Sequence, residues 1–144
     1  MTMTFHLVCT LAARGDRLAE AIAFVESFCD ANGVGRSDCL RVSLVVEELF
    51  TNTVTHGFGG GSDAPVRIAL SVDASELELS YEDSAAPFDP LAWLGRRADD
   101  PERPALERPV GQLGIALVAG MAARIAYARE GDRNRLRVAL QRQG

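Results

Sequence analysis

The sequence contains no lysine: all 15 of its basic residues are arginine. This absence excludes a P-loop that holds phosphates with lysine, a Schiff-base enzyme, and a kinase built around a strand lysine. The sequence also lacks a His-Glu-x-x-His zinc motif and a Gly-x-Ser-x-Gly nucleophile elbow. Neither a metalloprotease nor an α/β-hydrolase is therefore indicated.

Cysteine is scarce, and Cys9, Cys29 and Cys39 have no metal-type spacing. We interpret them as reduced thiols. The sequence has no signal peptide and no apolar run near the ~18 residues of a membrane helix. We therefore expect a cytoplasmic protein without membrane contact. The formal net charge of −5 argues against direct binding of nucleic acid.

The 144 residues are the size of one domain, and no repeat or linker divides residues 1–144. Ser37 is the expected N-cap of a helix that runs to about Gly57, and residues 59–62 are an expected flexible link. Residues 96–109 are charged and rich in proline, which predicts an irregular, mobile loop. Other helices are expected at about 15–33 and 112–122, and strands at 4–11, 65–72, 77–82, 124–129 and 133–141. This order predicts an α+β two-layer sandwich, in which a mixed, mostly antiparallel sheet carries its helices on one face.

One row of residues along the second predicted helix changes from apolar to polar. Its members lie about one turn apart and read Leu40, Leu44, Glu48, Asn52 and His56. If the row stays on the core face, its polar members point into a partly covered cavity, where a ligand or ion offsets the cost of burying them. The alternative is that the row drifts by about 40° per four residues onto the solvated face.

Two further blocks can complete such a cavity. Asp83 ends an alternating strand, where a carboxylate can accept the exocyclic amine of adenine, although aspartate is also common in turns after strands. Gly111 and Gly114 open the last predicted helix, with Ile115 directly behind them. Glycines there let backbone N–H groups approach phosphates, although Gly-x-x-Gly is also found in ordinary turns.

The three blocks read Glu-x-x-x-Asn-x-x-x-His, Asp-x-x-x-x-Phe-Asp-Pro and Gly-x-x-Gly-Ile-x-Leu-Val. In this order they resemble the ATP-binding domain shared by histidine kinases, gyrase-type ATPases, Hsp90 and mismatch-repair proteins, the GHKL superfamily. Over nearly its full length the chain is most similar to the bacterial anti-sigma factor serine/threonine kinases.

The resemblance implies the histidine kinase-like ATPase (Bergerat) fold, with Mg-ATP held beneath a lid at residues 96–109. It implies that Asn52 ligates Mg²⁺ through its side-chain oxygen. It also implies that Glu48 is the general base toward the attacking hydroxyl. Asp83 corresponds to the residue that reads adenine. Contacts with the nucleotide are implied for the remaining members of the blocks: His56, Ala85, Gly111, Gly114 and Ile115.

The reaction implied by the resemblance is in-line transfer of the γ-phosphoryl group of ATP to a serine or threonine of a small anti-anti-sigma (STAS-type) partner. The chain is then expected to be an anti-sigma factor, which binds a sigma factor and so regulates transcription. Relatives commonly pair, so the resemblance also allows a homodimer.

Ala85 departs from the family pattern, which usually has Asp-x-Gly where this chain has Asp83-Ser84-Ala85. Alanine adds a methyl group and disfavours φ > 0, so we expect weaker nucleotide affinity or a different local turn. This keeps open a second reading, a module that binds ATP or has lost it and only sequesters a partner. A fragment of a histidine kinase fits less well, because no helical hairpin presents His6 or His56 as a phosphoacceptor.

Overall fold

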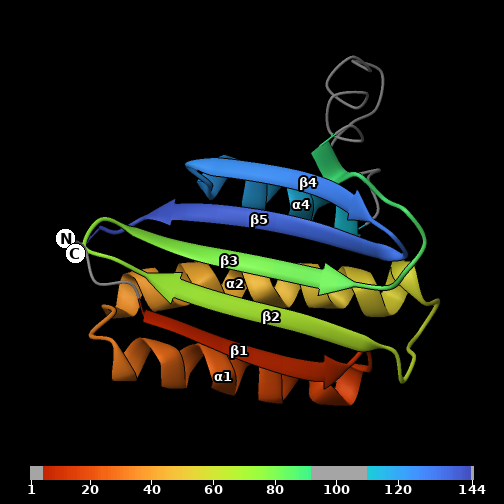
Figure 1. The fold of residues 1–144 in the computed structure, drawn as a ribbon, viewed down its shortest axis with the longest axis horizontal. Coiled ribbons are helices and arrows are strands. Elements are labelled where there is room, and N and C mark those ends of the chain that lie inside the picture. The colour runs from red at the N-terminus through yellow and green to blue at the C-terminus, as the bar shows by residue number, and fades with distance from the viewer. Residues whose placement is uncertain (1–4, 92–109, 144) are drawn as a thin grey trace.

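The computed structural model describes residues 5–91 and 110–143, and the predicted lid at 96–109 lies outside them. The described strands form one five-stranded sheet in the order β1-β2-β3-β5-β4, in which every neighbouring pair is antiparallel. Figure 1 shows β1 at one edge and β4 at the other. The strands span Phe5–Ala12 (β1), Pro65–Val72 (β2), Glu76–Asp83 (β3), Arg124–Glu130 (β4) and Arg133–Gln141 (β5).

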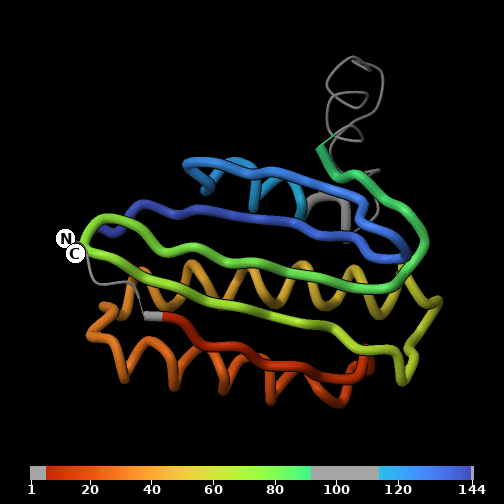
Figure 2. The backbone as a smooth tube through the Cα atoms, viewed as in Figure 1, coloured from red at the N-terminus to blue at the C-terminus, as the bar shows by residue number. Residues whose placement is uncertain are grey.

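The described helices lie on one face of this sheet, as Figures 1 and 2 show. They are α1 (Leu18–Ala31), which follows a 3-10 turn (η1, Gly15–Arg17), α2 (Arg36–Asn52) and α4 (Val110–Met121). α2 contacts both α1 and α4, so it forms the centre of the helical layer. None of the described helices has the length and apolar character needed to cross a membrane. The two-layer α+β prediction is confirmed.

The hydrophobic core lies between the sheet and the helices. Alternate residues of each central strand point toward the helices, as the period of two in a strand requires. Burial of these side chains is the main force that fixes the register of the strands. Its largest fully buried side chains are Val66, Ile68 and Leu70 of β2, Leu77 of β3, Val138 of β5, and Val25, Phe28, Val42, Val45, Val46, Phe50 and Val118 of the helices.

Two predictions about α2 are wrong. Ser37 is not its N-cap: the helix begins at Arg36, and the capping residue Gly35 supplies no side chain. Leu40 and Leu44 do not belong to the core, because they are 60% and 36% exposed. An i, i+4 row drifts around the helix axis, which leaves these two leucines outside the buried face. That face consists of Val42, Val45, Val46, Leu49 and Phe50.

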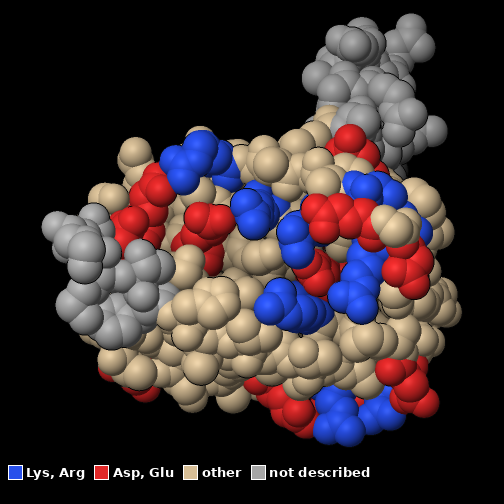
Figure 3. Space-filling view, in the orientation of Figure 1, with Lys and Arg blue, Asp and Glu red and all other residues tan. Residues whose placement is uncertain are grey.

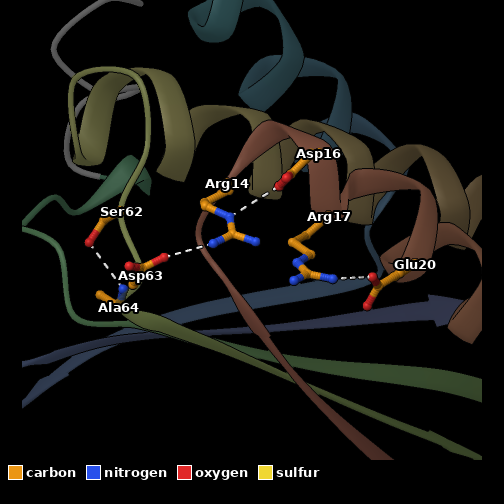
Figure 4. Close-up of polar contacts among 7 residues, drawn as sticks. All are labelled: Arg14, Asp16, Arg17, Glu20, Ser62, Asp63 and Ala64. Carbon is orange, nitrogen blue, oxygen red and sulfur yellow. Dashed lines mark hydrogen bonds and ion pairs between the residues drawn. The ribbon is translucent and has the colours of Figure 1, made fainter.

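The glycine-rich link at residues 59–62 is attached to the end of β1. Its three glycines all have positive φ angles, which glycine adopts without steric cost. The Ser62 N–H donates to the carbonyl of Ala13 at 2.9 Å. Arg14 donates from Nη1 to Oδ1 of Asp63 at 2.8 Å (Figure 4). The link therefore has a defined path at its C-terminal end.

The face of the sheet without helices carries charges of both signs close together (Figure 3). Glu82 of β3 is buried on this face between two arginines of β5, with Arg135 Nε at 2.6 Å and Arg133 Nη1 at 3.7 Å from its carboxylate oxygens. Arg124 of β4 donates to both carboxylate oxygens of Glu76, each at 2.7 Å. These pairs connect β3 to its neighbour β5 and to β4 at the edge of the sheet.

Candidate functional site

Residues from all three sequence blocks line one cavity of about 410 Å³ at the end of the sheet. Asn52 and His56 come from the second helical segment, Asp83 and Ala85 from the end of β3, and Ile115 from α4. This volume lies within the range of small-molecule sites. The other lining residues are Leu49, Thr53, Gly57, Tyr81, Ala86, Pro87, Phe88, Pro90, Tyr127, Asn134 and Leu136.

The cavity is mainly apolar, with a few polar groups at its wall. Leu49, Ile115 and Leu136 supply aliphatic surface, and Phe88 and Tyr127 supply aromatic surface. Such a lining suits a flat, largely apolar ring that makes a small number of directed polar contacts. A purine base meets this description.

The sequence predicted that the helix carrying Asn52 continues as one α-helix to Gly57. In the structure it does not. α2 ends at Asn52, and a π-helical turn, η2 (Thr53–Gly57), follows it. π-helical turns are often found at functional sites. Here the turn places Thr53 against the end of β3, where its hydroxyl contacts Tyr81 and Asp83.

Hydrogen bonds hold the Asp83 carboxylate from three sides. Its Oδ2 accepts from the Thr53 hydroxyl at 2.9 Å. Its Oδ1 accepts from Nδ2 of Asn134 at 2.9 Å and from the Ala85 N–H at 3.2 Å. A carboxylate has about four lone-pair sites, so these three donors leave room for one further hydrogen bond.

Thr53 and Tyr81 form a buried chain of hydroxyl groups behind Asp83. The two hydroxyl oxygens lie 2.6 Å apart, and both are within hydrogen-bonding distance of the Leu49 carbonyl. Burial raises the pKa of Tyr81, so Tyr81 stays protonated at neutral pH. Either hydroxyl can donate to the other, and Tyr81 can be the first donor. Thr53 can then donate its own proton to Asp83.

Glu48 does not line the cavity but packs against Gly114 of α4. A Cβ atom placed on Gly114 would lie 1.7 Å from Oε2 of Glu48, so only glycine leaves room for this carboxylate. Burial, together with the neighbouring charge of Glu47, raises the pKa of Glu48. In this structure the space above Gly114 is filled by Glu48. Gly111 lies in the first turn of α4.

Asn52 lies one turn of α2 beyond Glu48, toward the cavity, and its side-chain oxygen is buried. Within residues 5–91 and 110–143, no group of three or more His, Cys, Asp or Glu residues could hold a metal ion. A cation at Asn52 would therefore need oxygen ligands from a bound nucleotide and from water. Mg²⁺ is commonly bound in this way.

Ala85 does not have the left-handed backbone that the family's glycine would permit: among the described residues, every one with positive φ is a glycine. The Ala85 side chain is 4% exposed. Its methyl group packs against Gly57, where a Cβ would lie only 2.9 Å from the Cβ of Ala85. The missing side chain at Gly57 therefore makes room for the additional methyl group at Ala85.

A family profile for the histidine kinase-like ATPase domain matches residues 11–140. The chain belongs to the histidine kinase-like ATPase domain family. Among curated proteins, no sequence matches this chain significantly. Assignment to this ATPase family agrees with the cavity, which brings together residues from all three sequence blocks.

Solved structures share the histidine kinase-like fold at low sequence identity. The RsbU and RsbW domains of Rv1364c from Mycobacterium tuberculosis match with 15% identity and a TM-score of 0.65, over 96% of this chain and 32% of that one. This chain therefore spans about a third of the Rv1364c structure. The SiaB-SiaC complex from Pseudomonas aeruginosa matches with 16% identity and a TM-score of 0.67, over 93% and 88% of the two chains. The catalytic domain of the histidine kinase ThkA matches with 12% identity and a TM-score of 0.52, over 99% and 97%.

Several residues of this histidine kinase-like cavity were not predicted from the sequence. The Thr53 hydroxyl contacts Asp83, Tyr81 contacts Thr53 behind it, and Asn134 reaches Asp83 from β5. Only the strand pairing could have indicated Asn134, because the register places it directly opposite Asp83. Thr53 had no such signal, since its position depends on the π-helical turn.

Proposed function

We propose that this chain binds ATP with Mg²⁺ in the cavity and transfers the γ-phosphoryl group to a serine or threonine of a partner protein. The observation that carries the proposal is that Asn52 and Asp83, from distant parts of the sequence, line one cavity, with Glu48 one helical turn from Asn52. The family match to an ATPase domain supports the nucleotide.

The adenine base fits the apolar part of the cavity, with its exocyclic amine donating to Asp83. The phosphates then extend toward Asn52 and the N-terminal turn of α4, where helix N–H groups favour anions. Bound Mg²⁺ would neutralise charge on the phosphates. Asn52 orients the cation through its buried oxygen.

Glu48 is proposed to accept the proton of the attacking hydroxyl. Its raised pKa makes it a stronger proton acceptor than an exposed glutamate. The hydroxyl oxygen forms a bond to the γ-phosphorus as the bond to the bridging oxygen of the β-phosphate breaks. ADP leaves with the electron pair of that bond. Positioning and charge neutralisation supply most of the rate enhancement in such reactions.

The proposed acceptor is a STAS-type anti-anti-sigma protein, and the proposed second partner is a sigma factor. This chain would bind each of them as a monomer or as a homodimer. Support comes from the similarity of the three sequence blocks to anti-sigma factor kinases. It also comes from two fold neighbours, one containing an RsbW domain and one, SiaB, solved in complex with SiaC. Phosphorylation of the acceptor would control how much sigma factor the chain holds.

A second candidate function is a binding module without transfer activity. The contact between Glu48 and Gly114 favours it, because this carboxylate lies outside the cavity lining. Replacing Glu48 by glutamine separates the two functions. If the chain is a kinase, the Glu48→Gln variant loses phosphoryl transfer but keeps nucleotide binding. If it is a binding module, neither wild type nor the variant transfers phosphate.

The nucleotide site is tested by titrating a fluorescent ADP analogue with and without Mg²⁺. Asp83→Asn and Asn52→Ala are compared with wild type, and Asp63→Asn, on an exposed loop, is the matched control. We expect Asp83→Asn to weaken binding in both conditions and Asn52→Ala to remove the Mg²⁺-dependent part. Equal affinity in all four proteins would place the site elsewhere.

Transfer is tested with ATP labelled in the γ-phosphate and a candidate STAS-type protein. Label on the partner's serine or threonine supports the kinase, and its loss in Glu48→Gln supports the role of Glu48. If ATP binds but no candidate accepts label, the binding module is favoured.

A further inference from the structure

Asn134 lines the cavity, and both ends of its side-chain amide make hydrogen bonds. It lies on β5, directly opposite Asp83 of β3 and Arg129 of β4 in the strand register. Its Nδ2 donates to Oδ1 of Asp83 at 2.9 Å and to the carbonyls of Ala86 and Ala85 at 3.0 and 3.2 Å. One side chain thus holds both Asp83 and the backbone that follows it.

The other end of the same amide is held by donors. Oδ1 of Asn134 accepts from the Tyr127 hydroxyl at 2.6 Å, and from the Phe88 N–H and Arg129 Nη1 at 3.3 Å each. A backbone N–H and a guanidinium can only donate, whereas carboxylates and carbonyls can only accept. The partners therefore fix which end of the amide is nitrogen and which is oxygen.

This arrangement has a consequence for the Asp83 carboxylate. Asn134 on one side and Thr53 on the other prevent it from rotating. The segment from Ala85 to Phe88, which lines the cavity beside it, is fixed by the same amide. Without Asn134, both the carboxylate and this segment lose contacts that set their position.

We propose that Asn134 is a positioning residue for base recognition, which makes the cavity prefer a purine with an amino group at C6 over one with a carbonyl there. The inference rests on the proposed nucleotide site. A fixed carboxylate accepts a hydrogen bond from the C6 amine of adenine. It repels the C6 carbonyl of hypoxanthine, because two acceptors then face each other.

The test compares the dissociation constants of ADP and inosine diphosphate, which differ mainly at C6. We expect wild type to prefer ADP by about 10- to 100-fold, the range for a hydrogen bond to a charged group. In Asn134→Ala the carboxylate can turn away, so the preference should fall to within a few-fold of one. A side chain that only stabilised the fold would weaken both ligands equally and leave their ratio unchanged.

Two further variants complete the comparison. Tyr127→Phe keeps the ring but removes the hydroxyl that donates to Asn134, so its preference should be intermediate. It decides the outcome if Asn134→Ala does not fold. Arg137→Ala is the matched control on β5, because this exposed residue lies on the opposite face of the sheet, and its preference should equal that of wild type.

The outcomes separate this inference from the proposed function. If wild type prefers ADP and Asn134→Ala keeps that preference in full, the role of Asn134 is refuted while the nucleotide site stands. If wild type binds both ligands equally, Asp83 does not read the base. If wild type binds neither, the proposed function and the inference fail together.

Discussion

Gly114 of α4 packs against the carboxylate of Glu48. Replacing this glycine by alanine places a methyl group where the carboxylate lies. The new Cβ would lie 1.7 Å from Oε2 and 2.4 Å from Cδ of Glu48. A relaxed C···O contact is about 3.3 Å, so the carboxylate oxygen must move by roughly 1.6 Å. Glu48 has a flexible side chain that can make this movement by rotation.

The expected effects on stability and on activity are opposite. Alanine is favoured over glycine inside a helix by about 1 kcal/mol, which should equal or slightly exceed the cost of rotating the flexible Glu48 side chain away. We therefore expect a free energy of unfolding equal to or slightly above that of wild type. Misplacing a catalytic group by about 1 Å can cost about 100-fold in rate, and phosphoryl transfer should fall by a similar factor. Affinity for ADP should change by only a few-fold.

Gly120 supplies the matched control, because it lies in the same helix and a Cβ there meets no atom within 4 Å. Gly120→Ala should stabilise the protein and leave transfer unchanged. In a Glu48→Ala background, Gly114→Ala should stabilise the protein as much as Gly120→Ala does, since no carboxylate is displaced. Thermal denaturation and a transfer assay measure these effects. Unchanged transfer in Gly114→Ala would refute the role of this contact. Loss of ADP binding would instead indicate that phosphates lie directly against Gly114.

Three other predictions follow from contacts in the structure. Ala85→Gly should not improve nucleotide affinity in isothermal titration, because the Ala85 methyl already fits against Gly57; a tighter variant would contradict this account. Gly57→Ala should lower the free energy of unfolding by about 1–3 kcal/mol through overpacking, and combining it with Ala85→Gly should restore stability. An equal loss of stability with and without Ala85→Gly would exclude the contact. Asp38→Ala should lower the free energy of unfolding in urea by about 2–3 kcal/mol, because its buried carboxylate accepts from Arg41 and from the Gln143 N–H; a change below about 0.5 kcal/mol would show that these bonds contribute little.

A fifth prediction concerns pH. The charge of Glu47 raises the pKa of Glu48, after the larger effect of burial. As the proposed general base, Glu48 must be ionised, so transfer should be lost as pH falls through this pKa. Glu47→Gln removes the like charge and should move that acid limb to lower pH. Because the pKa of Glu48 is raised in the folded state, ionised Glu48 lowers the free energy of unfolding once the pH rises above the ordinary pKa of glutamate. Glu47→Gln should reduce this loss of stability. An unmoved acid limb in the pH–rate profile would mean that another group controls it.

Much of the fold could be predicted because its signals are local. The strands predicted at 65–72 and 77–82 match β2 and β3 within one residue at each end, and the helix predicted at about 15–33 contains α1. One helix was predicted from the N-cap Ser37 to about Gly57, but the N-cap is Gly35 and the last turn is π-helical. Both features depend on how the chain packs at the two ends of α2, and no sequence period reports that.

The candidate site could be predicted only in part. The spacing of Glu48, Asn52, Asp83 and Ile115 carried the family resemblance, and the family match agrees with it. The spacing could not show that Gly114 contacts Glu48, or that Gly57 accommodates Ala85. Each of these is a contact between residues far apart in the chain, whose distance is set by how the helices pack on the sheet.

By itself, the sequence determined the order of strands and helices, the exclusion of lysine-dependent phosphate chemistry, and the three blocks that carry the family. These properties reside in side-chain type and in spacing along one segment. Only the tertiary structure decided that Asn134 lies opposite Asp83 and that Glu48 rests on Gly114. Strand register and helix packing are set by burial of the whole core, so such contacts between distant segments emerge only when the complete chain is folded.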